Sequence, residues 1–225
     1  MSAPAASWRI GVADSETTAA WDPPAAADRG AVFVCAPGAG GHMNDRSIMA
    51  ISSALRDRGI GVVRFNFLYR ARGGSRPDPM PTLVECWRAV AARVRRELAP
   101  AQLILGGRSM GGRAASVAAA EGLPCDRLLL LAYPLHPPGH PEKLRAAHLS
   151  AIAQPVLCIN GTRDTFCDRP LMERTLATLG ANWRMHWLAD ADHGFHVLKR
   201  SGRSDADVVT EAADAAAAWL CEVEE

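Results

Sequence analysis

The pattern G-x-S-x-G marks the serine best suited to chemistry in this sequence. Gly107, Ser109 and Gly111 form the pattern between an apolar run and a stretch of small residues. On a tight turn from a strand to a helix, such a serine is held in a strained conformation, and a β-carbon on either flanking glycine would clash. A glycine-rich turn with an incidental serine is the alternative. The predicted strand before the turn and helix after it favour a nucleophile.

A serine hydroxyl is a weak nucleophile, so it needs a histidine base and an acid that orients the histidine, in the chain order Ser, Asp, His for this arrangement. We predict that His193 is the base and Asp164 is the acid, because each follows a predicted strand and would reach the same edge of a parallel sheet as the serine. Asp168 and His196 are the competing residues. Asp164 lies nearer the end of its strand, and a glycine directly follows His193, which favours the first assignment in each case.

The loop 37–42 (PGAGGH) carries few side chains, so its backbone can approach a substrate closely. We predict that the N–H groups of Ala39 and Met110 form an oxyanion hole, where the loss of one donor typically costs about 2.7 to 4 kcal/mol of transition-state stabilisation. The residues expected to line the pocket are Gly38, Gly40, His42, Tyr69 and Arg108. His42 equally fits a polar residue at the entrance of a helix.

Short apolar runs alternate with stretches of helical character, which is typical of β-α units stacked on a mainly parallel sheet with helices on both faces. Strands are predicted at 31–36, 61–67, 102–106, 127–132, 156–160 and 183–188. Helices are predicted at 45–58, 81–98, 112–121, 170–179 and 205–222. The fold class is therefore α/β. We expect residues 1–225 to form a single domain, with residues 1–30 as an edge strand or a loose segment.

Two segments between these elements, 69–79 and 134–141, are rich in glycine and proline and are predicted as irregular loops. The segment after the fourth predicted strand is short, so it leaves little room for an inserted lid. We therefore expect a comparatively open site.

The composition excludes several classes of protein. Hydrophobic residues make up 48% of the chain and charged residues 22%, which is too apolar for intrinsic disorder. The 25 basic and 24 acidic residues leave a net charge of +1, so nucleic acid is not an expected partner. No apolar run approaches the roughly 20 residues that span a bilayer, and the first residues lack a signal-peptide pattern. With scattered cysteines as well, we expect a soluble protein in the reducing cytoplasm.

These motifs resemble the α/β-hydrolase superfamily, in particular its small cap-less members of the dienelactone-hydrolase group, from about residue 30 onward. Within it, the segments 106–113 (GGRSMGGR), 38–41 (GAGG) and 133–139 (YPLHPPG) resemble the testis-expressed hydrolase-like family. The resemblance implies the α/β-hydrolase fold without a large cap domain, and it assigns nucleophile, acid and base to the same three residues. Pro37 departs from the histidine that many hydrolases of this fold carry before this glycine.

Together these observations predict a serine hydrolase that cleaves a carboxylic ester or thioester of a small molecule through an acyl-enzyme. Neither a metal nor an organic cofactor is expected. A noncatalytic interaction module that binds a partner through loops such as 69–76 is the alternative, although the three intact side chains argue against it. The sequence does not indicate an oligomeric state.

Two further interpretations fit less well. A nucleotide-binding domain based on Gly38 and Gly40 would need a third glycine where Met43 stands and an acid where Asn66 stands. A metal site would draw on three histidines whose proline-rich separation matches no recognised ligand spacing: His136, His140 and His148. We expect these histidines to lie in a solvated loop.

Overall fold

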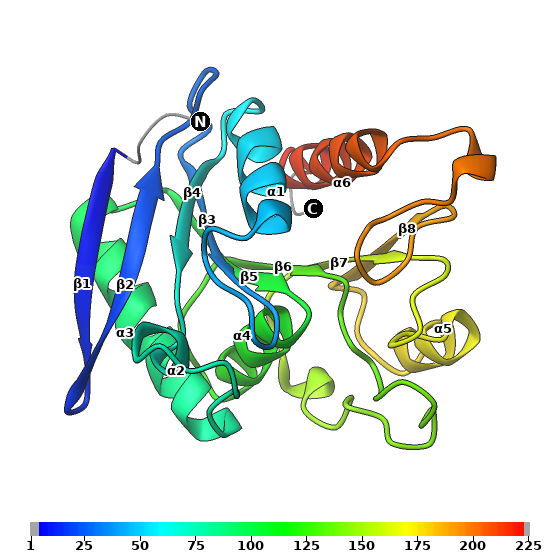
Figure 1. The fold of residues 1–225 in the computed structure, drawn as a ribbon, viewed down its shortest axis with the longest axis horizontal. Helices are drawn as coiled ribbons and strands as arrows, with labels where there is room; N and C mark the ends of the chain where they lie inside the picture. Colours follow the sequence, from blue (N-terminus) through cyan, green and yellow to red (C-terminus); the bar gives the residue numbers. More distant parts are fainter. Residues whose placement is uncertain (1–4, 223–225) are drawn as a thin grey trace.

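The computed structural model describes residues 5–222, which form an eight-stranded sheet covered by helices on both faces (Figure 1). The strands are β1 Ala6–Val12, β2 Ser15–Asp22, β3 Ala31–Ala36, β4 Gly61–Phe65, β5 Gln102–Arg108, β6 Arg127–Leu131, β7 Val156–Gly161 and β8 Trp183–Leu188. Their spatial order is β1-β2-β4-β3-β5-β6-β7-β8, and the strands from β3 onward are parallel. The carboxyl ends of these parallel strands therefore meet at one edge of the sheet.

Within the described residues, the α-helices are five longer ones and one short one, all between strands except the last, which follows β8. They are α1 Arg46–Arg56, α2 Leu68–Ala71, α3 Met80–Leu98, α4 Met110–Ala120, α5 Arg169–Leu176 and α6 Asp205–Leu220. The buried side chains of α1 and α6 share one hydrophobic cluster with the sheet, whereas those of α3, α4 and α5 share a second cluster on the opposite face. The α/β class and the helices on both faces are confirmed.

Strand β3 shows why the parallel strands are apolar throughout. All six of its residues are buried. Because successive side chains on a strand point to opposite faces, Val32 and Val34 enter the cluster under α3 and α4, whereas Phe33 and Cys35 enter the cluster under α1 and α6. A strand buried on both faces requires a continuous apolar run, and this requirement made β3 recognisable in the sequence.

The N-terminal segment forms a hairpin, so it contributes a second strand besides the edge strand that was one of the two expectations. Strands β1 and β2 pair antiparallel, and β2 pairs antiparallel with β4. A buried ion pair at 2.6 Å between Arg64 Nε and Asp22 Oδ2 ties the hairpin to β4. All six predicted strands are present, and the hairpin adds two more, of which β1 is the edge strand of the sheet. Strand β1 buries only alternate residues, and such half-polar strands give a weaker signal than apolar runs do.

Several element boundaries also differ from the prediction. Strand β5 continues through Arg108, and α4 begins at Met110, so that only one residue separates strand from helix. Strand β4 ends at Phe65 rather than at residue 67. Residues 68–71 form α2, although 69–79 was predicted to be irregular. This one-turn helix precedes the glycine pair at 73–74, which prevents it from continuing.

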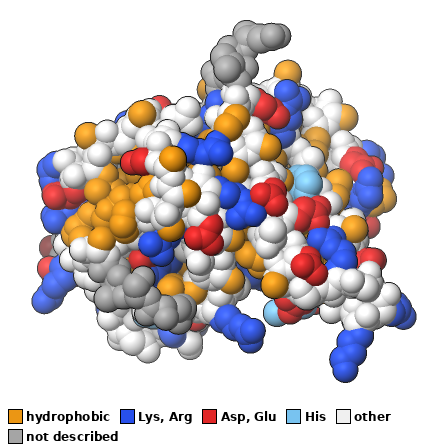
Figure 2. Space-filling model, turned by 90° about the horizontal axis from the view of Figure 1, so that it is seen from above, with side chains coloured by type: hydrophobic (Ala, Val, Ile, Leu, Met, Phe, Trp, Pro, Cys, Tyr) orange, Lys and Arg blue, Asp and Glu red, His pale blue; other side chains and the backbone are white. Residues whose placement is uncertain are grey.

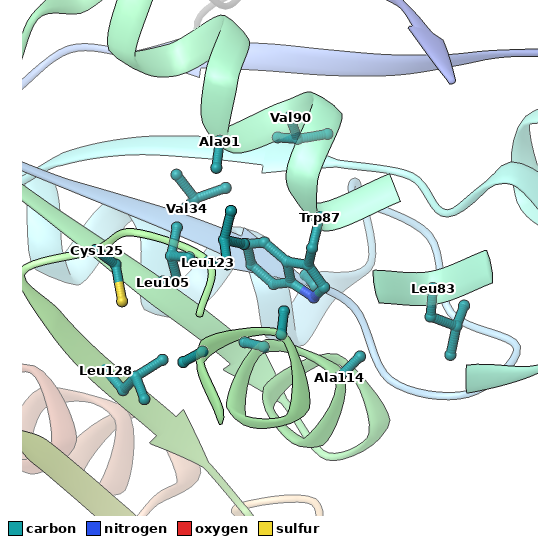
Figure 3. Close-up of a cluster of buried hydrophobic side chains, with 14 of the residues drawn as sticks. Val34, Leu83, Trp87, Val90, Ala91, Leu105, Ala114, Leu123, Cys125 and Leu128 are labelled. Carbon is teal, nitrogen blue, oxygen red and sulfur yellow. The ribbon is translucent and has the colours of Figure 1, made fainter. Parts of the chain in front are cut away.

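A dense core beneath β5 supports the edge of the sheet where the loops meet. Trp87 of α3 is completely buried, and its ring forms a T-shaped pair with that of Phe65 at a centroid distance of 4.8 Å. Around it lie side chains from β3, β5 and α4, including Val34, Leu105 and Ala114 (Figure 3). Because such packing resists deformation, the turn that follows β5 rests on a rigid base.

The charged side chains on the surface agree with the near-zero net charge of the sequence, and the cysteines agree with the expectation of scattered free thiols. On the face in Figure 2, basic and acidic side chains are interspersed rather than separated. Within residues 5–222, no helix combines the length and the apolar character that crossing a bilayer would require. All six cysteines are free thiols, and five of them are buried. Burial raises the pKa of Cys35 and Cys86 to about 12, so these two behave as small hydrophobic residues rather than as nucleophiles.

Candidate active site

Ser109 is the single residue of the turn between β5 and α4, and its backbone is strained. Its φ of 50° and ψ of −117° are rare for a residue with a side chain. A β-carbon on Gly107 would lie 2.2 Å from the carbonyl oxygen of Ala36, and one on Gly111 would lie 2.6 Å from the same oxygen. Only glycine fits at these two positions, because β3 passes so close to the turn.

Replacing Gly107 with alanine tests this steric explanation. The new β-carbon would meet backbone rather than a movable side chain, at a φ of 131° that L-residues rarely adopt. We expect Gly107→Ala to lower the free energy of unfolding by about 3 kcal/mol or more, measured by chemical denaturation. The matched control is Gly122→Ala, because Gly122 also has a positive φ of 83° but has open space around it. It should cost about 1 to 2 kcal/mol, and equal costs at the two sites would contradict the explanation.

Three side chains from three loops meet at the carboxyl edge of the sheet. His193 Nε2 lies 2.9 Å from Ser109 Oγ, and His193 Nδ1 lies 2.9 Å from both carboxylate oxygens of Asp164. The serine follows β5, the aspartate follows β7 and the histidine follows β8. The geometry lets the imidazole accept the hydroxyl proton at Nε2 while its Nδ1–H donates to the carboxylate.

The Asp164 carboxylate is buried and is held by two donors besides the histidine. The side chain of Asp164 has no exposed surface. Its Oδ1 accepts the N–H of Phe166 at 2.8 Å, and its Oδ2 accepts Nδ2 of Asn160 at 3.1 Å. Asn160 was not predicted as a site residue, although a polar residue at the end of an apolar strand run was a usable signal. These donors fix the position of the carboxylate, which suits an acid that orients a base.

The loop that carries His193 is ordered by its own hydrogen bonds and by an aromatic contact. Asp192 Oδ1 accepts the N–H groups of Gly194 at 2.7 Å and of His196 at 3.0 Å. The ring of Phe166 stacks on the imidazole with a centroid distance of 4.2 Å. Phe166 was not predicted as a site residue, because a phenylalanine in a loop gives no such signal. These contacts keep the imidazole ring facing Ser109.

Arg108, which is predicted to line the pocket, also holds this loop. Its guanidinium donates to the carbonyl oxygen of His193 and, at 3.4 Å, to that of Gly194, and it lies over the ring of Phe195. Burial lowers the pKa of Arg108, and the carboxylate of Asp164 partly opposes the shift. Arg108 therefore joins the turn of the nucleophile to the loop of the base.

We expect Arg108→Met to lower kcat about tenfold with little change in KM, because a loop that places its base less accurately loses turnover rather than ground-state binding. Steady-state kinetics on an ester would measure this. Arg127→Met is the matched control. Arg127 is also buried, lies over Trp219 and donates to the carbonyl oxygen of Trp219, but it lies at the opposite end of the parallel strands. A loss of stability without a loss of kcat is expected for Arg127→Met, and the same outcome for Arg108→Met would contradict the prediction.

The two competing residues have other partners. Asp168 caps the N-terminus of α5, where its Oδ1 accepts the N–H of Leu171 at 2.9 Å. His196 is exposed, and its Nδ1 lies 2.7 Å from Asp205 Oδ2 at the start of α6. Neither side chain forms a hydrogen bond with Ser109, Asp164 or His193.

The loop after β3 passes the serine and presents backbone donors. A β-carbon on Gly38 would lie 3.6 Å from that of Ser109. The N–H of Gly40 donates to the hydroxyl of Tyr69 and that of Gly41 donates to the carbonyl of Gly38. Within the described residues, the N–H of Ala39 has no hydrogen-bond partner, and neither has that of Met110, the first residue of α4. An oxyanion hole requires donors that are free in this way.

The histidines have structural partners. Both ring nitrogens of His42 are occupied, by the N–H of Asn44 and by the side chain of Asn66. His148 Nε2 lies 2.7 Å from Ser116 Oγ, and burial lowers its pKa to about 4. His136 is buried, so it does not lie in a solvated loop as expected, and its Nε2 accepts the N–H of Asp168. No group of three or more potential metal ligands occurs in the described part of the chain.

The mainly parallel sheet and the strained serine turn after β5 define an α/β-hydrolase fold. The sequence model of an alpha/beta hydrolase domain matches residues 29–221. The chain therefore belongs to this family of alpha/beta hydrolases, as its motifs predicted. The finer likeness to the testis-expressed hydrolase-like family stays a prediction.

Solved structures agree with this placement. An α/β serine hydrolase without a lid from Xanthomonas campestris has a TM-score of 0.77 and 26% identity, over 100% of this chain and 99% of that one. An α/β serine hydrolase homologue from Coxiella burnetii has a TM-score of 0.77 at 18% identity, over 98% and 100%. Dienelactone hydrolase from Anabaena variabilis has a TM-score of 0.71 at 19% identity, over 96% and 95%. The small, cap-less form of the fold and its similarity to the dienelactone-hydrolase group are confirmed, and the family supports hydrolase activity.

Proposed function

We propose that this protein is a serine hydrolase that cleaves a carboxylic ester or thioester of a small molecule. The observation that carries the proposal is the unbroken line of hydrogen bonds from Ser109 Oγ through His193 to the buried Asp164 carboxylate. In this role, Ser109 is the nucleophile, His193 is the general base and acid, and Asp164 orients the imidazole and stabilises its charged form.

The reaction proceeds in two steps. His193 Nε2 takes the proton of Ser109 as Oγ attacks the acyl carbon, and the carbonyl oxygen becomes an oxyanion that accepts the N–H groups of Ala39 and Met110. When the tetrahedral intermediate collapses, His193 returns the proton to the leaving alcohol or thiol. Water then gives a proton to the same imidazole and attacks the acyl carbon. The imidazole returns this proton to Ser109 Oγ as the bond between Oγ and the acyl carbon breaks and the acid leaves. In this scheme, His193 carries out every proton transfer, and the N–H groups of Ala39 and Met110 stabilise the negative charge that develops.

The segment between β6 and β7 supports a small and accessible substrate. It contains one three-residue 3₁₀ helix, Leu149–Ala151, in the place where a lid would be inserted. The side chain of His193 keeps 22% of its surface exposed. The relative from Xanthomonas campestris also lacks a lid. A short acyl group that approaches the serine from solvent fits this arrangement better than a long lipid enclosed by a cap.

A panel of p-nitrophenyl esters and acyl thioesters with short and medium acyl chains tests the proposal. We expect hydrolysis, and we expect acid-quenched enzyme to carry the acyl mass on the peptide that contains Ser109. A fluorophosphonate probe should label the same residue. If folded protein neither hydrolyses these substrates nor reacts with the probe, the proposal is wrong and a noncatalytic role is the better explanation.

A further inference from the structure

The hydroxyl of Tyr69 contacts the loop after β3 on both sides of Ala39. The N–H of Gly40 donates to the Tyr69 hydroxyl at 3.0 Å, and the hydroxyl donates to the carbonyl oxygen of Gly38 at 3.4 Å. A single buried side chain therefore holds the two peptide groups that meet at Ala39. The catalytic mechanism described above does not use this side chain.

These contacts help to fix the direction in which the N–H of Ala39 points. The carbonyl of Gly38 and the N–H of Ala39 belong to one planar trans peptide group, in which they point in opposite directions. When Tyr69 holds that carbonyl, the N–H of Ala39 is fixed on the opposite side of the peptide plane. The N–H of Gly41 donates to the same carbonyl at 3.0 Å, and Tyr69 adds a second donor to it. Together they restrict a peptide that is flanked by glycines, one of which, Gly40, has a φ of 71°.

Tyr69 is itself held firmly. Its side chain is 3% exposed and its ring stacks on Phe67. Its backbone N–H donates to Asp78 Oδ2 at 3.0 Å, and its carbonyl oxygen accepts the N–H of Gly74 at 2.7 Å. Burial raises the pKa of Tyr69, although the N–H of Gly40 partly opposes this shift. The phenol therefore stays protonated near neutral pH and can both donate and accept.

We propose that Tyr69 is a positioning residue, which aims the N–H of Ala39 at the oxyanion by holding the carbonyl of Gly38 and the N–H of Gly40. The proposal rests on the proposed hydrolase function. It predicts that Tyr69 contributes to the stabilisation of the oxyanion although it touches neither the substrate nor the proton-transfer groups.

The test compares an ester with its thionoester, in which sulfur replaces the carbonyl oxygen. The sulfur gains less from the oxyanion-hole donors, so the ratio of the two kcat/KM values reports on the oxyanion hole rather than on the base. We expect Tyr69→Phe to lower kcat for the ester about 10- to 100-fold with little change in KM. The ester-to-thionoester ratio should fall with it.

Tyr133→Phe is the matched control, because Tyr133 is the other tyrosine of the chain and is equally buried. Its hydroxyl also donates to a backbone carbonyl, that of Arg145 at 2.7 Å, which lies outside the oxyanion loop. The ratio should stay at its wild-type value in Tyr133→Phe. Normalising each rate to the sites titrated by a fluorophosphonate removes any effect of unfolded protein.

Asp78→Ala is a second variant. It removes the carboxylate that accepts the backbone N–H of Tyr69 and leaves the phenol unchanged, so it should lower the ester-to-thionoester ratio by a smaller factor. An active wild-type enzyme whose ratio is unchanged in both Tyr69→Phe and Asp78→Ala would overturn the role of Tyr69 and leave the hydrolase proposal standing. A wild-type enzyme without hydrolase activity or probe labelling would overturn both. A lower ratio in the two variants, with Tyr133→Phe unchanged, would support the proposal.

Discussion

Ser109→Ala is expected to lower kcat for an ester roughly 10⁴- to 10⁶-fold, because removing the nucleophile leaves only the oxyanion donors and substrate binding to stabilise the transition state. The folded structure should persist. Alanine relieves no strain at this φ of 50° but also adds no atoms, and the N–H of residue 109 still donates to the carbonyl of Leu131 at 2.8 Å. Pre-steady-state kinetics with an activated ester would measure the loss of both the burst and the turnover.

Ser116→Ala provides the control, because Ser116 lies on the helix that follows the nucleophile and forms a second serine-histidine pair. Its Oγ lies 2.7 Å from His148 Nε2, slightly closer than the pair at the proposed site. Ser116 is completely buried, however, and its hydroxyl donates to the carbonyl of Arg113. A substrate cannot reach it, so Ser116→Ala should keep its turnover. If Ser116→Ala were inactive and Ser109→Ala active, the nucleophile would be assigned to the wrong residue.

The parallel strands of the sheet could be predicted from the sequence, and so could the meeting of the three loops that carry the proposed site. Particular residues show why. Strand β3 is buried on both faces, so its apolar run had one interpretation. Once the strands are parallel, the residues that follow β5, β7 and β8 must share one edge of the sheet. Ser109, Asp164 and His193 could therefore be placed in neighbouring loops without any knowledge of their side-chain contacts.

Features that depend on side-chain direction were not predictable in this way. Arg108 and Tyr69 both lie beside the predicted turn and loop, and a pocket lining was the natural expectation for each. That expectation stays a prediction. The sequence did not reveal that Arg108 also reaches the carbonyls of the base loop or that Tyr69 reaches the loop after β3. The residue type and its neighbours in sequence do not reveal which backbone groups a long side chain will meet, because these groups come from elements that are distant along the chain.

Strands that are only half buried were the hardest to predict from the sequence. Residues of β1 alternate between buried and exposed positions, and β2 contains serine, threonine and glutamate. Its burial becomes clear only when β2 pairs with β4 and when Thr17 donates to the carbonyl of Asn66. Tertiary pairing, rather than local composition, makes this segment a hairpin.

Asp164→Asn should lower kcat about 10⁴-fold, because an amide in place of the carboxylate favours the wrong tautomer of His193. The carboxylate accepts three donors: the N–H of Phe166, Nδ2 of Asn160 and Nδ1 of His193. An asparagine has one acceptor oxygen, so its amino group must face at least one of these groups. If it faces the imidazole, it donates to Nδ1 and the proton moves to Nε2, where it blocks transfer from Ser109. If it faces a donor instead, a buried polar group loses its partner at a cost of about 1 to 3 kcal/mol.

Asp168→Asn separates these effects from a simple change of charge near the site. Asp168 caps α5 through the N–H of Leu171, and asparagine caps helices about as well as aspartate does. Both stability and kcat should therefore stay close to the wild-type values in Asp168→Asn. Equal losses of kcat in the two variants would mean that the charge of this loop, rather than the orientation of one imidazole, sustains catalysis. The measurement is kcat at several pH values on folded protein. A loss confined to Asp164→Asn would show that the buried carboxylate sets the tautomer of His193.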